Sequence, residues 1–371
     1  MAMQQAFAAG AQANSPVYVI AEIGTGHGGD LSAAEALISA AAESGADCAK
    51  FQTIFADEIV PQNVGDVPLP GGSIPLFQRF RDLERPLEFY AELKTLCRRY
   101  HIDFLSTPFG LRSARLLRKI SVDAVKIASP ELNHLPLLQE VAGYGVPLII
   151  SSGVSRLEDI ERAMEITAGS QVTLLHCVTA YPAPAEDYNL RILPLLRALF
   201  GVSVGVSDHS MDPLLVPVLA AAMGARVIEK HITLSHSGSG LDDPIALEPA
   251  EFRKMTSAVR RVAAEGAESA IEEIIAEYGQ ERVDAVLGSG RKQPAPSEQA
   301  NYGRTNRSAH AVRDLPAGHT ISLQDFDLLR TEKILHPGVS PHMAQLLIGA
   351  ALTRPVAAGQ GIRWEDVLTR C

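Results

Sequence analysis

The sequence predicts an α/β protein in which eight strand-helix units form a closed (β/α)8 barrel, a TIM barrel, followed by a small C-terminal domain. Short apolar or β-branched runs alternate with amphipathic helical segments, and eight such units fall within roughly 250 residues. Each apolar run also ends on charged, hydroxyl or histidine side chains. This pattern favours a barrel, because the active site of a barrel lies at the carboxyl ends of its strands.

The expected strands are short and are separated by helical segments. The first strand ends at a glycine-rich loop, residues 24–29, after which Asp30 is suited to cap a helix that continues through Ala42. A long insert rich in proline and glycine follows the second strand. An open doubly wound sheet is the competing architecture, but the number of units and their total length match a barrel. The strands are predicted at residues 17–22, 47–51, 102–105, 124–127, 147–150, 172–175, 202–206 and 227–231.

Local composition divides the chain into four parts. Residues 1–15 are rich in alanine, glutamine and glycine without the features of a signal peptide, so we expect a flexible N-terminal tail. The barrel is expected over residues 16–287. Glycine, serine, proline, lysine and glutamine gather in residues 288–303, which predicts a linker, and residues 304–371 are expected to form the small domain.

Overall composition indicates a packed protein that does not bind nucleic acid or membranes. The 371 residues are 46% hydrophobic and 20% charged, and the mean hydropathy is +0.07. The formal net charge is −10, no basic cluster is interleaved with aromatic residues, and no apolar run approaches a membrane span. We expect a cytoplasmic protein with reduced thiols, because the cysteines lack paired spacing. They are Cys48, Cys97, Cys177 and Cys371.

Two lysines at strand ends indicate an anion site. Lys50 and Lys126 each stand within an apolar segment, and a buried ammonium group requires an anionic partner. Hydroxyl side chains at neighbouring strand ends would join them around a phosphate or a phosphate-bearing carboxylate. The alternative is structural ion pairing, for example between Glu22 and either lysine. The hydroxyl groups are those of Thr107, Ser129, Ser151 and Ser207.

Two histidines at neighbouring strand ends indicate one metal ion. His209 and His231 each follow an apolar strand, and imidazole is a common ligand for divalent metals. His176 stands within an apolar run and is interpreted as a core histidine. His27 follows the glycine-rich loop and is equally open to a role in substrate positioning or to none.

With these residues in view, the chain resembles the sialic acid synthase family. Seven blocks match in order, and together they extend over the whole barrel. They are Ala21-Glu22-Ile23-Gly24, Lys50-Phe51-Gln52-Thr53, Ser106-Thr107-Pro108-Phe109, Lys126-Ile127-Ala128-Ser129, Leu175-His176-Cys177 with Tyr181-Pro182, Ser207-Asp208-His209, and Glu229-Lys230-His231. The C-terminal part resembles the antifreeze-like SAF domain of this family, which has a β-clip fold. Its blocks are Asn306-Arg307-Ser308, Val312-Arg313-Asp314-Leu315-Pro316-Ala317-Gly318, Pro337-Gly338-Val339-Ser340-Pro341 and Leu347-Ile348-Gly349.

The resemblance implies a condensation reaction. Phosphoenolpyruvate would react with the open-chain aldehyde of an N-acylated hexose to give a nine-carbon 2-keto acid and phosphate. It also implies a divalent cation, with Mn²⁺ as the expected ion and Mg²⁺ or Co²⁺ as alternatives, acting as a Lewis acid on the carbonyl. A Schiff-base pyruvate lyase that uses Lys126, and a sugar-binding protein without catalysis, are the other functions that remain open.

Carried over by motif, the resemblance also implies a role for each site residue. The metal ligands would be His209 and His231. The phosphoenolpyruvate pocket would contain Lys50, Thr107, Lys126, Ser129, Ser151 and Ser207. The sugar and metal end would contain Glu22, Gln52, Glu131, Tyr181, Glu229 and Asp242. Glu22, Glu229 and Asp242 are the candidate catalytic acids or bases, and the sequence does not distinguish their roles.

Departures from the family pattern concern the sugar. The loop after His231 has Ser235, Leu241 and Asp243 where the family has other residues, so we expect a sugar other than plain N-acetylmannosamine. The family also places a small-domain arginine in the site of the partner subunit. His336 stands at that position here, and Arg330 precedes it. The resemblance therefore implies a domain-swapped homodimer in which one of these two residues reaches the partner's sugar. Lys292 of the linker is a further residue expected to face the site.

Overall fold

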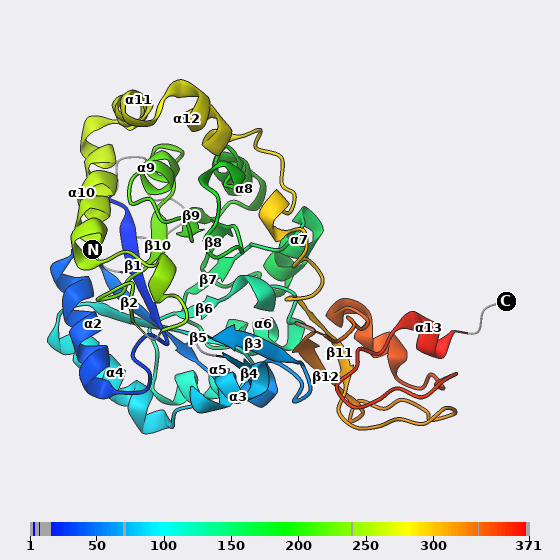
Figure 1. Ribbon diagram of the computed structural model, residues 1–371. Helices are drawn as coiled ribbons and strands as arrows, with labels where there is room; N and C mark the ends of the chain where they lie inside the picture. The colour runs from blue at the N-terminus through cyan, green and yellow to red at the C-terminus, as the bar shows by residue number, and fades with distance from the viewer. Residues whose placement is uncertain are drawn as a thin grey trace.

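The computed structural model describes Met3, Phe7 and residues 16–69, 72–238, 240–332 and 334–368 (Figure 1). Eight parallel strands form one sheet in the order β5-β2-β1-β10-β9-β8-β7-β6, and contact between β5 and β6 closes it into a barrel. The predicted barrel is therefore confirmed. The strands are β1 Tyr18–Gly24, β2 Cys48–Thr53, β5 Asp103–Pro108, β6 Val125–Ile127, β7 Leu148–Ser151, β8 Val172–Cys177, β9 Ser203–Asp208 and β10 Val227–His231.

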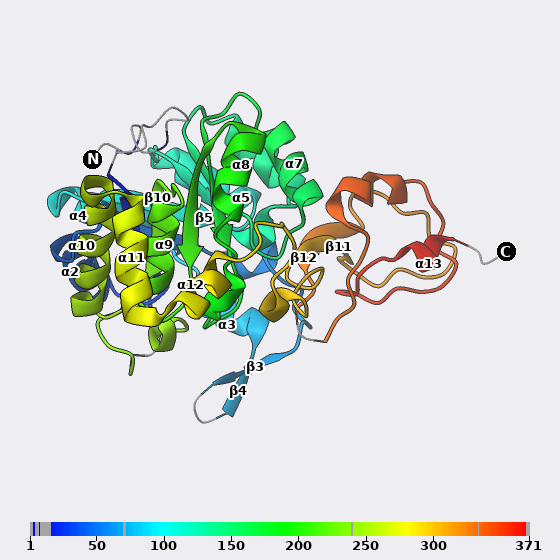
Figure 2. The same cartoon turned by 90° about the horizontal axis from the view of Figure 1, so that it is seen from above.

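Helices cover the outside of the barrel (Figures 1 and 2). Asp30 caps the first of them as predicted, because its carboxylate accepts the backbone N–H groups of Ser32 and Ala33. The helices that alternate with the strands are α2 Leu31–Glu43, α4 Leu87–Arg99, α5 Leu111–Lys119, α6 Leu135–Ala142, α7 Leu157–Ile166, α8 Ile192–Phe200, α9 Leu215–Ala222 and α10 Pro249–Glu265. Two more helices, α11 Ala267–Tyr278 and α12 Gln280–Leu287, follow α10 and pack beside α9.

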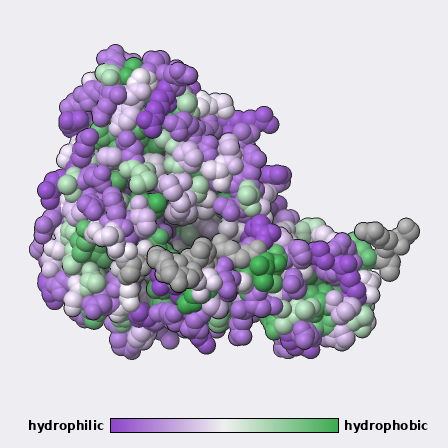
Figure 3. All heavy atoms as spheres, viewed as in Figure 1, coloured by the Kyte–Doolittle hydropathy of each residue, from purple (hydrophilic) through white to green (hydrophobic). Residues whose placement is uncertain are grey.

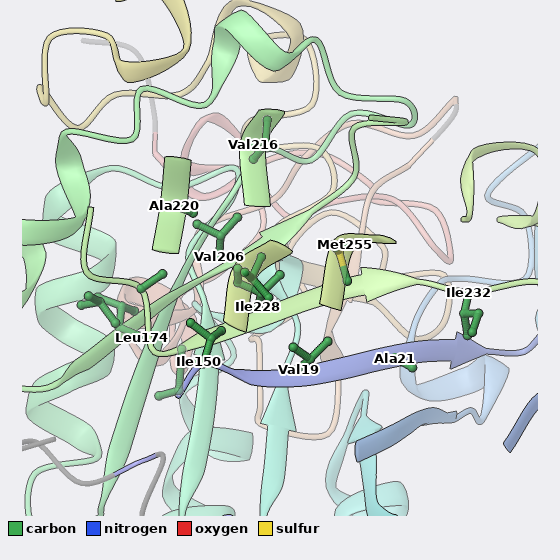
Figure 4. Packing of buried hydrophobic residues seen from close by; sticks show 14 of the residues in the cluster. Val19, Ala21, Ile150, Leu174, Val206, Val216, Ala220, Ile228, Ile232 and Met255 are labelled. Atoms are coloured by element: carbon green, nitrogen blue, oxygen red, sulfur yellow. The ribbon is translucent and has the colours of Figure 1, made fainter. Parts of the chain in front are cut away.

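Successive side chains along each strand point alternately into two separate apolar clusters, one inside the barrel and one outside it. Tyr18 and Ile20 of β1 belong to the cluster inside the barrel, whereas Val19, Ala21 and Ile23 belong to the cluster between the strands and the helices. Figure 4 shows this outer cluster, in which side chains of five strands meet those of α9 and α10. The labelled strand residues are Val19, Ala21, Ile150, Leu174, Val206 and Ile228, and the labelled helix residues are Val216, Ala220 and Met255.

The insert after β2 contains structure that the sequence did not predict. It forms a two-stranded antiparallel hairpin, β3 Asp66–Leu69 with β4 Gly72–Pro75, followed by α3 Leu76–Asp82. Figure 2 shows that the hairpin projects away from the barrel. The insert also packs against the small domain, since Leu335 belongs to the same apolar cluster as Ile59 and Val60.

The N-terminal segment departs from the prediction at two positions. Met3 and Phe7 are buried in the cluster inside the barrel, and the ring of Phe7 lies 5.4 Å from that of Tyr18. The expectation of a loose tail is wrong at these two residues, because both side chains fill the barrel interior. The rest of the predicted tail, 1–15, lies outside the described residues.

The small domain begins after a linker that follows α12. Its strands β11 Arg307–Ala311 and β12 Phe326–Arg330 pair antiparallel, and the apolar core includes Leu315, Ile321 and Leu347. A short helix, α13 Trp364–Val367, completes it. The domain lies beside the barrel near the carboxyl ends of β2, β5 and β6 (Figure 1). In the part of the chain that the structure describes, no helix is long and apolar enough to cross a membrane.

Acid should destabilise the barrel through His176. Burial lowers the pKa of His176 from 6.5 to about 3, with Lys292 as a smaller cause. The unfolded chain would bind a proton below pH 6.5 while the folded chain would not, so stability is lost as pH falls from 6.5 towards 3. One such group contributes a slope of about 1.4 kcal/mol per pH unit. We expect His176→Gln to lower the pH dependence of the unfolding free energy by about this slope between pH 6 and 4.

Urea denaturation at a series of pH values measures this effect. His101→Asn is the matched control, because His101 is exposed and asparagine tolerates its positive φ of 54°. Identical slopes for the wild-type protein and His176→Gln would show that His176 is not buried in its neutral form.

Candidate functional site

A cavity lies at the carboxyl ends of the barrel strands. It collects thirteen of the residues singled out in the sequence, contributed by all eight strands or the loops that follow them. They are Glu22, Lys50, Gln52, Thr107, Lys126, Ser129, Ser151, Tyr181, Ser207, His209, Glu229, His231 and Asp242. Strand register explains part of this convergence, because Glu22 pairs with His231 across β1 and β10, and Glu229 pairs with Ser207 across β10 and β9.

Buried lysines and carboxylates form one ionic cluster in the cavity. Lys50 Nζ lies 2.7 Å from Glu22 Oε2 and 3.5 Å from Glu229 Oε1, and Lys126 Nζ lies 3.8 Å from Glu229 Oε2. All four side chains are 5% exposed or less. The ion pair between Glu22 and Lys50, left open in the sequence, is therefore present. Glu229 bridges the two lysines, so each ammonium group has a carboxylate partner.

The two lysines have opposite pKa shifts. Burial opposes the charge of Lys50, but Glu22 and Glu229 outweigh it and raise the pKa of Lys50. At Lys126 burial is the larger effect and lowers the pKa, since Glu229 is more distant and Lys50 repels it. The pKa of Glu229 falls to about 2 despite its burial, because Lys126, Lys50 and the hydroxyl of Ser207 stabilise the carboxylate.

Hydroxyl groups line the side of the cavity near Lys126. Its ammonium group donates a hydrogen bond to Ser151 Oγ at 2.6 Å, and Lys50 donates to Thr107 Oγ1 at 3.4 Å. Thr179 Oγ1 is buried in the cavity wall and has no hydrogen-bond partner among the described residues. Two ammonium groups and several free or shared hydroxyls are the donor set that binds phosphate and carboxylate groups.

The two histidines lie together in the cavity. Their ring centroids are 5.5 Å apart, and the ring of Tyr181 stacks on His209 at 4.2 Å. His209 Nδ1 lies 2.7 Å from the carbonyl oxygen of Val178, which places the proton on Nδ1 and leaves Nε2 as the ligand nitrogen. Asp242 Oδ2 lies 3.5 Å from His231 Nδ1.

A metal at this place would take two ligands from the described chain. No three His, Cys, Asp or Glu side chains within the described ranges are arranged around a common metal position. Two imidazoles facing a solvent-accessible cavity nonetheless fit an ion that keeps several water or substrate oxygens among its ligands. The protein donor set is therefore compatible with an open divalent site.

Glu131 lies outside the cavity, contrary to its predicted contact with sugar. It is fully buried, and its two carboxylate oxygens pair with Arg307 and Arg330 of the small domain. Arg307 also donates hydrogen bonds to the carbonyl groups of Glu58 and Phe109 in the barrel. Because both oxygens of Glu131 are engaged by guanidinium groups, this residue joins the two domains.

His336 also lies away from the cavity of its own chain, whereas Arg330 lies near it. His336 is exposed on the small domain beside Arg354 and Gln360. The guanidinium group of Arg330 lies 5.2 Å from the ring centroid of Phe109, and Phe109 lines the cavity. A contact of His336 with a partner subunit stays a prediction.

Three other residues singled out in the sequence, His27, His176 and Lys292, are not part of the cavity lining. His27 packs against Phe51 and Phe89, and burial lowers its pKa to about 4, so the structure favours the reading without a substrate contact. His176 is a core histidine as predicted, with Nε2 2.6 Å from the carbonyl oxygen of Tyr188. Lys292 donates to the carbonyl of Ser152 at 2.8 Å, behind the cavity wall.

Five residues of the lining were not proposed from the sequence. Phe109, Ala128, Pro130 and Cys177 adjoin strand ends, and Thr179 follows β8 by two residues. The sequence feature that could have indicated these residues was their position next to strand ends. Apolar and small side chains at those positions give no chemical indication of a site, because most such residues belong to the core.

The barrel, the small β domain and the polar cavity at the strand ends define a class of protein, a TIM-barrel protein with a C-terminal β domain beside its site. The family model described as NeuB family matches residues 37–270, and the SAF domain model matches residues 306–368. The chain therefore belongs to the NeuB family, and the resemblance inferred from the seven blocks is confirmed.

Named relatives match over nearly the whole chain. The spore coat polysaccharide biosynthesis protein SpsE of Bacillus subtilis is 35% identical over 96% of this chain and 95% of that protein. N,N'-diacetyllegionaminic acid synthase of Legionella pneumophila is 33% identical over 94% of each. The chain is accordingly an enzyme of the acid synthase type.

Solved structures show the same architecture. The crystal structure of SpsE from Bacillus subtilis matches with a TM-score of 0.80 at 34% identity, covering 96% of each chain. N-acetylneuraminic acid synthetase from Leptospira borgpetersenii, in complex with citrate, matches with a TM-score of 0.63 at 31% identity. That match covers 78% of this chain and 90% of the other.

Inorganic phosphate should bind next to Lys126. We expect phosphate to raise the melting temperature of the wild-type protein, and Lys126→Met to weaken phosphate binding by at least tenfold, since a charge-assisted hydrogen bond contributes about 1.5–3 kcal/mol. Calorimetric titration with phosphate measures the affinity. Lys254→Met is the control, because Lys254 is exposed on α10. Equal phosphate affinity in both variants would contradict an anion site at Lys126.

Proposed function

We propose that the protein condenses phosphoenolpyruvate with the open-chain aldehyde of an N-acylated hexose, yielding a nine-carbon 2-keto acid of the sialic acid type and phosphate. The observation that carries this proposal is the cavity itself. It brings two buried ammonium groups and several hydroxyls together with two imidazoles. The ammonium and hydroxyl groups suit a phosphate and a carboxylate, and the imidazoles suit a metal that activates a carbonyl group for attack.

The charges of the cavity support a divalent cation. Glu22, Glu229 and Asp242 give three formal negative charges, and Lys50 and Lys126 give two positive charges. With both imidazoles neutral, as metal ligands must be, these groups have a formal net charge of −1. A divalent ion at His209 and His231 would make the net charge positive. We propose Mn²⁺, with Mg²⁺ or Co²⁺ as alternatives; when bound, the ion polarises the aldehyde carbonyl as a Lewis acid.

The chain's own residues would hold phosphoenolpyruvate through its two anionic ends. Lys50 donates to the hydroxyl of Thr107 and Lys126 donates to the hydroxyl of Ser151, and phosphate or carboxylate oxygens would replace some of these internal contacts. Ser129 and Ser207 extend the same surface. Holding the enol ether rigidly here would aim its C3 carbon at the side where the aldehyde binds.

The reaction then needs one carbon–carbon bond, one water molecule and one departing phosphate. C3 bonds to the aldehyde carbon, and the aldehyde oxygen takes a proton to become a hydroxyl. Positive character develops at C2, where a carboxylate such as Glu22 or Glu229 would stabilise it. As water adds at C2 it gives one proton to a carboxylate, which restores the proton that the aldehyde oxygen has taken. The bond between C2 and the phosphate oxygen then breaks, the C2 hydroxyl gives its proton to the departing phosphate, and the ketone remains. Asp242 and Glu22, on the side of His231, are the candidate bases.

We further propose that the sugar is a diacetamido hexose or a similar acceptor rather than plain N-acetylmannosamine. The loop after β10 supports this idea. Asp242 faces the cavity, whereas the adjacent Asp243 is buried and accepts the N–H of Gly240 at 2.6 Å. Asp243, which departs from the family pattern, thus shapes the loop. The similarity to a diacetyllegionaminic acid synthase points the same way. Gln52 and Tyr181 line this end of the cavity.

A domain-swapped homodimer in the cytoplasm is the proposed state of the protein. Apolar side chains around the mouth of the cavity support it, because Tyr181, Met211, Leu234 and Leu241 are each 45–52% exposed. The small domain also exposes apolar residues, and Figure 3 shows green atoms gathered on its visible face. The exposed apolar residues of the small domain include Leu323, Ile334 and Leu346. Burying both surfaces against a second copy would remove them from water.

Phosphate release in the presence of a sugar panel tests the reaction. We expect turnover with phosphoenolpyruvate, Mn²⁺ and a diacetamido hexose, loss of turnover with a chelator, and recovery when Mn²⁺ is restored. N-acetylmannosamine should react at least tenfold more slowly, because a misfitted acyl group costs about 1–3 kcal/mol. Full turnover of N-acetylmannosamine with no reaction of diacetamido sugars would refute the proposed substrate class. Borohydride trapping of pyruvate on Lys126 would instead reveal a Schiff-base lyase.

The shared site of the dimer is tested with His336. We expect a dimer in sedimentation experiments, and His336→Ala should raise KM for the sugar severalfold, about 1 kcal/mol, with little change in KM for phosphoenolpyruvate. His342→Ala is the control, since His342 is also exposed on the small domain. An unaltered sugar KM would exclude His336, and a fully active monomer would contradict the shared site.

A further inference from the structure

The linker between the two domains contacts the loops that form the anion side of the cavity. Its 3-10 helix η5, Pro296–Glu298, ends on Glu298, whose side chain is 1% exposed. Glu298 lies behind the cavity wall and has no part in the reaction steps proposed above. A buried carboxylate is unfavourable unless its oxygens are well paired, so its partners indicate what it does.

One oxygen of Glu298 binds both loops. Oε1 accepts the N–H of Val154, in the loop after β7, and the N–H of Thr179, in the loop after β8, each at 2.7 Å. Oε2 accepts the N–H of Ala295 within the linker at 3.0 Å. Since two amides share one acceptor atom, the position of Oε1 fixes the separation of the two loops.

The linker and the start of the small domain also bind the carbonyl groups of the same two residues. Asn306 Nδ2 donates to the carbonyl of Val154 at 3.1 Å, and Asn301 Nδ2 donates to the carbonyl of Thr179 at 3.3 Å. Val154 has a φ of 39°, in the left-handed region that a β-branched residue rarely adopts. Such a conformation persists only where surrounding contacts impose it, and Glu298 of the linker and Asn306 of the small domain supply two of these contacts.

These contacts continue to the hydroxyls of the cavity. Gly153, next to Val154, donates its N–H to Ser129 Oγ at 3.0 Å. The space beside it is filled, because a Cβ atom on Gly153 would lie 2.3 Å from Thr179 Oγ1 and 2.9 Å from Ser129 Oγ. Ser129 and Thr179 both line the cavity. The contacts from Glu298 therefore reach Ser129 through Val154 and Gly153 of the loop after β7, and they reach Thr179 directly through its own N–H.

We propose that Glu298 is a positioning residue for anion binding: its Oε1 sets the spacing of the loops after β7 and β8, and thereby places the hydroxyls of Ser129 and Thr179. This inference rests on the proposed function insofar as the anion is phosphoenolpyruvate. It gives the linker a role in substrate affinity. The small domain begins directly after the linker, so the packing of the linker against the barrel connects that domain to the anion side of the cavity.

Two substitutions of Glu298 distinguish the effect of its acceptor oxygen from the effect of its negative charge. Glu298→Gln retains a carbonyl oxygen, and two donors at the Oε1 position against one at Oε2 orient this oxygen towards Val154 and Thr179. Glu298→Ala removes the acceptor altogether. We expect calorimetry to give a phosphoenolpyruvate Kd within about threefold of wild type for the glutamine variant and at least about tenfold weaker for the alanine variant. KM for phosphoenolpyruvate should follow, whereas KM for the sugar should stay unchanged.

Asp325→Ala is the matched control. Asp325 is another buried carboxylate that accepts a backbone N–H, from Ser322, but it lies in the small domain. It should lower the melting temperature without changing the Kd for phosphoenolpyruvate. If Glu298→Ala does not fold, Asn301→Ala replaces it as the test variant. Asn301→Ala removes only the contact with the Thr179 carbonyl, and we expect it to weaken phosphoenolpyruvate binding by about threefold.

The proposal is overturned if Glu298→Ala folds and binds phosphoenolpyruvate with wild-type affinity. If Glu298→Ala does not fold, wild-type affinity in Asn301→Ala overturns it. Equal losses in the KM values of both substrates would also overturn it, because they indicate general damage. Parallel titrations with inorganic phosphate separate the two proposals. A wild-type protein that binds phosphate but not phosphoenolpyruvate would refute the proposed function, and the phosphate affinities of the variants would still decide the role of Glu298.

Discussion

The fold of this protein depends at its centre on keeping two lysines charged inside a barrel. Lys50 and Lys126 lie where water cannot solvate them, and Glu22 and Glu229 are their carboxylate partners. Each of these four side chains comes from a different strand, so the ion pairs form only when the barrel is closed in its proper register. The outer helices hold that register through the apolar contacts shown in Figure 4.

The same cluster explains how the cavity can be both stable and reactive. Internal carboxylates stabilise the ammonium groups, so the lysines remain in place without a ligand. Under the proposed function, an incoming anion would exchange with part of these contacts, because the exchange preserves the charge balance around each lysine. Burial lowers the pKa of Lys126, since its pairing with Glu229 is too weak to offset it. Lys126 would therefore gain most from a bound anion.

Contacts between the barrel and its C-terminal extension reach this cavity from two directions. Arg307 and Arg330 engage Glu131, one residue beyond Pro130 of the cavity lining. Glu298 engages the loops after β7 and β8 from the other side. The barrel thus supplies the reactive groups, while residues far along the sequence hold several loops that carry them.

By itself the sequence determined the barrel and the polar residues at its strand ends, because the carboxyl ends of parallel strands meet at one end of a barrel. The resemblance to the family supplied the rest of the thirteen cavity residues, among them Gln52, Tyr181 and Asp242. Only the tertiary structure decided the surroundings of Glu131, Met3 and Phe7. Glu131 follows a strand end like the cavity residues, yet the small domain supplies two guanidinium groups that neutralise it. Met3 and Phe7 lie in a polar-looking segment but fill the barrel interior. The partners of all three residues are distant in sequence, and local pattern contains no information about such contacts.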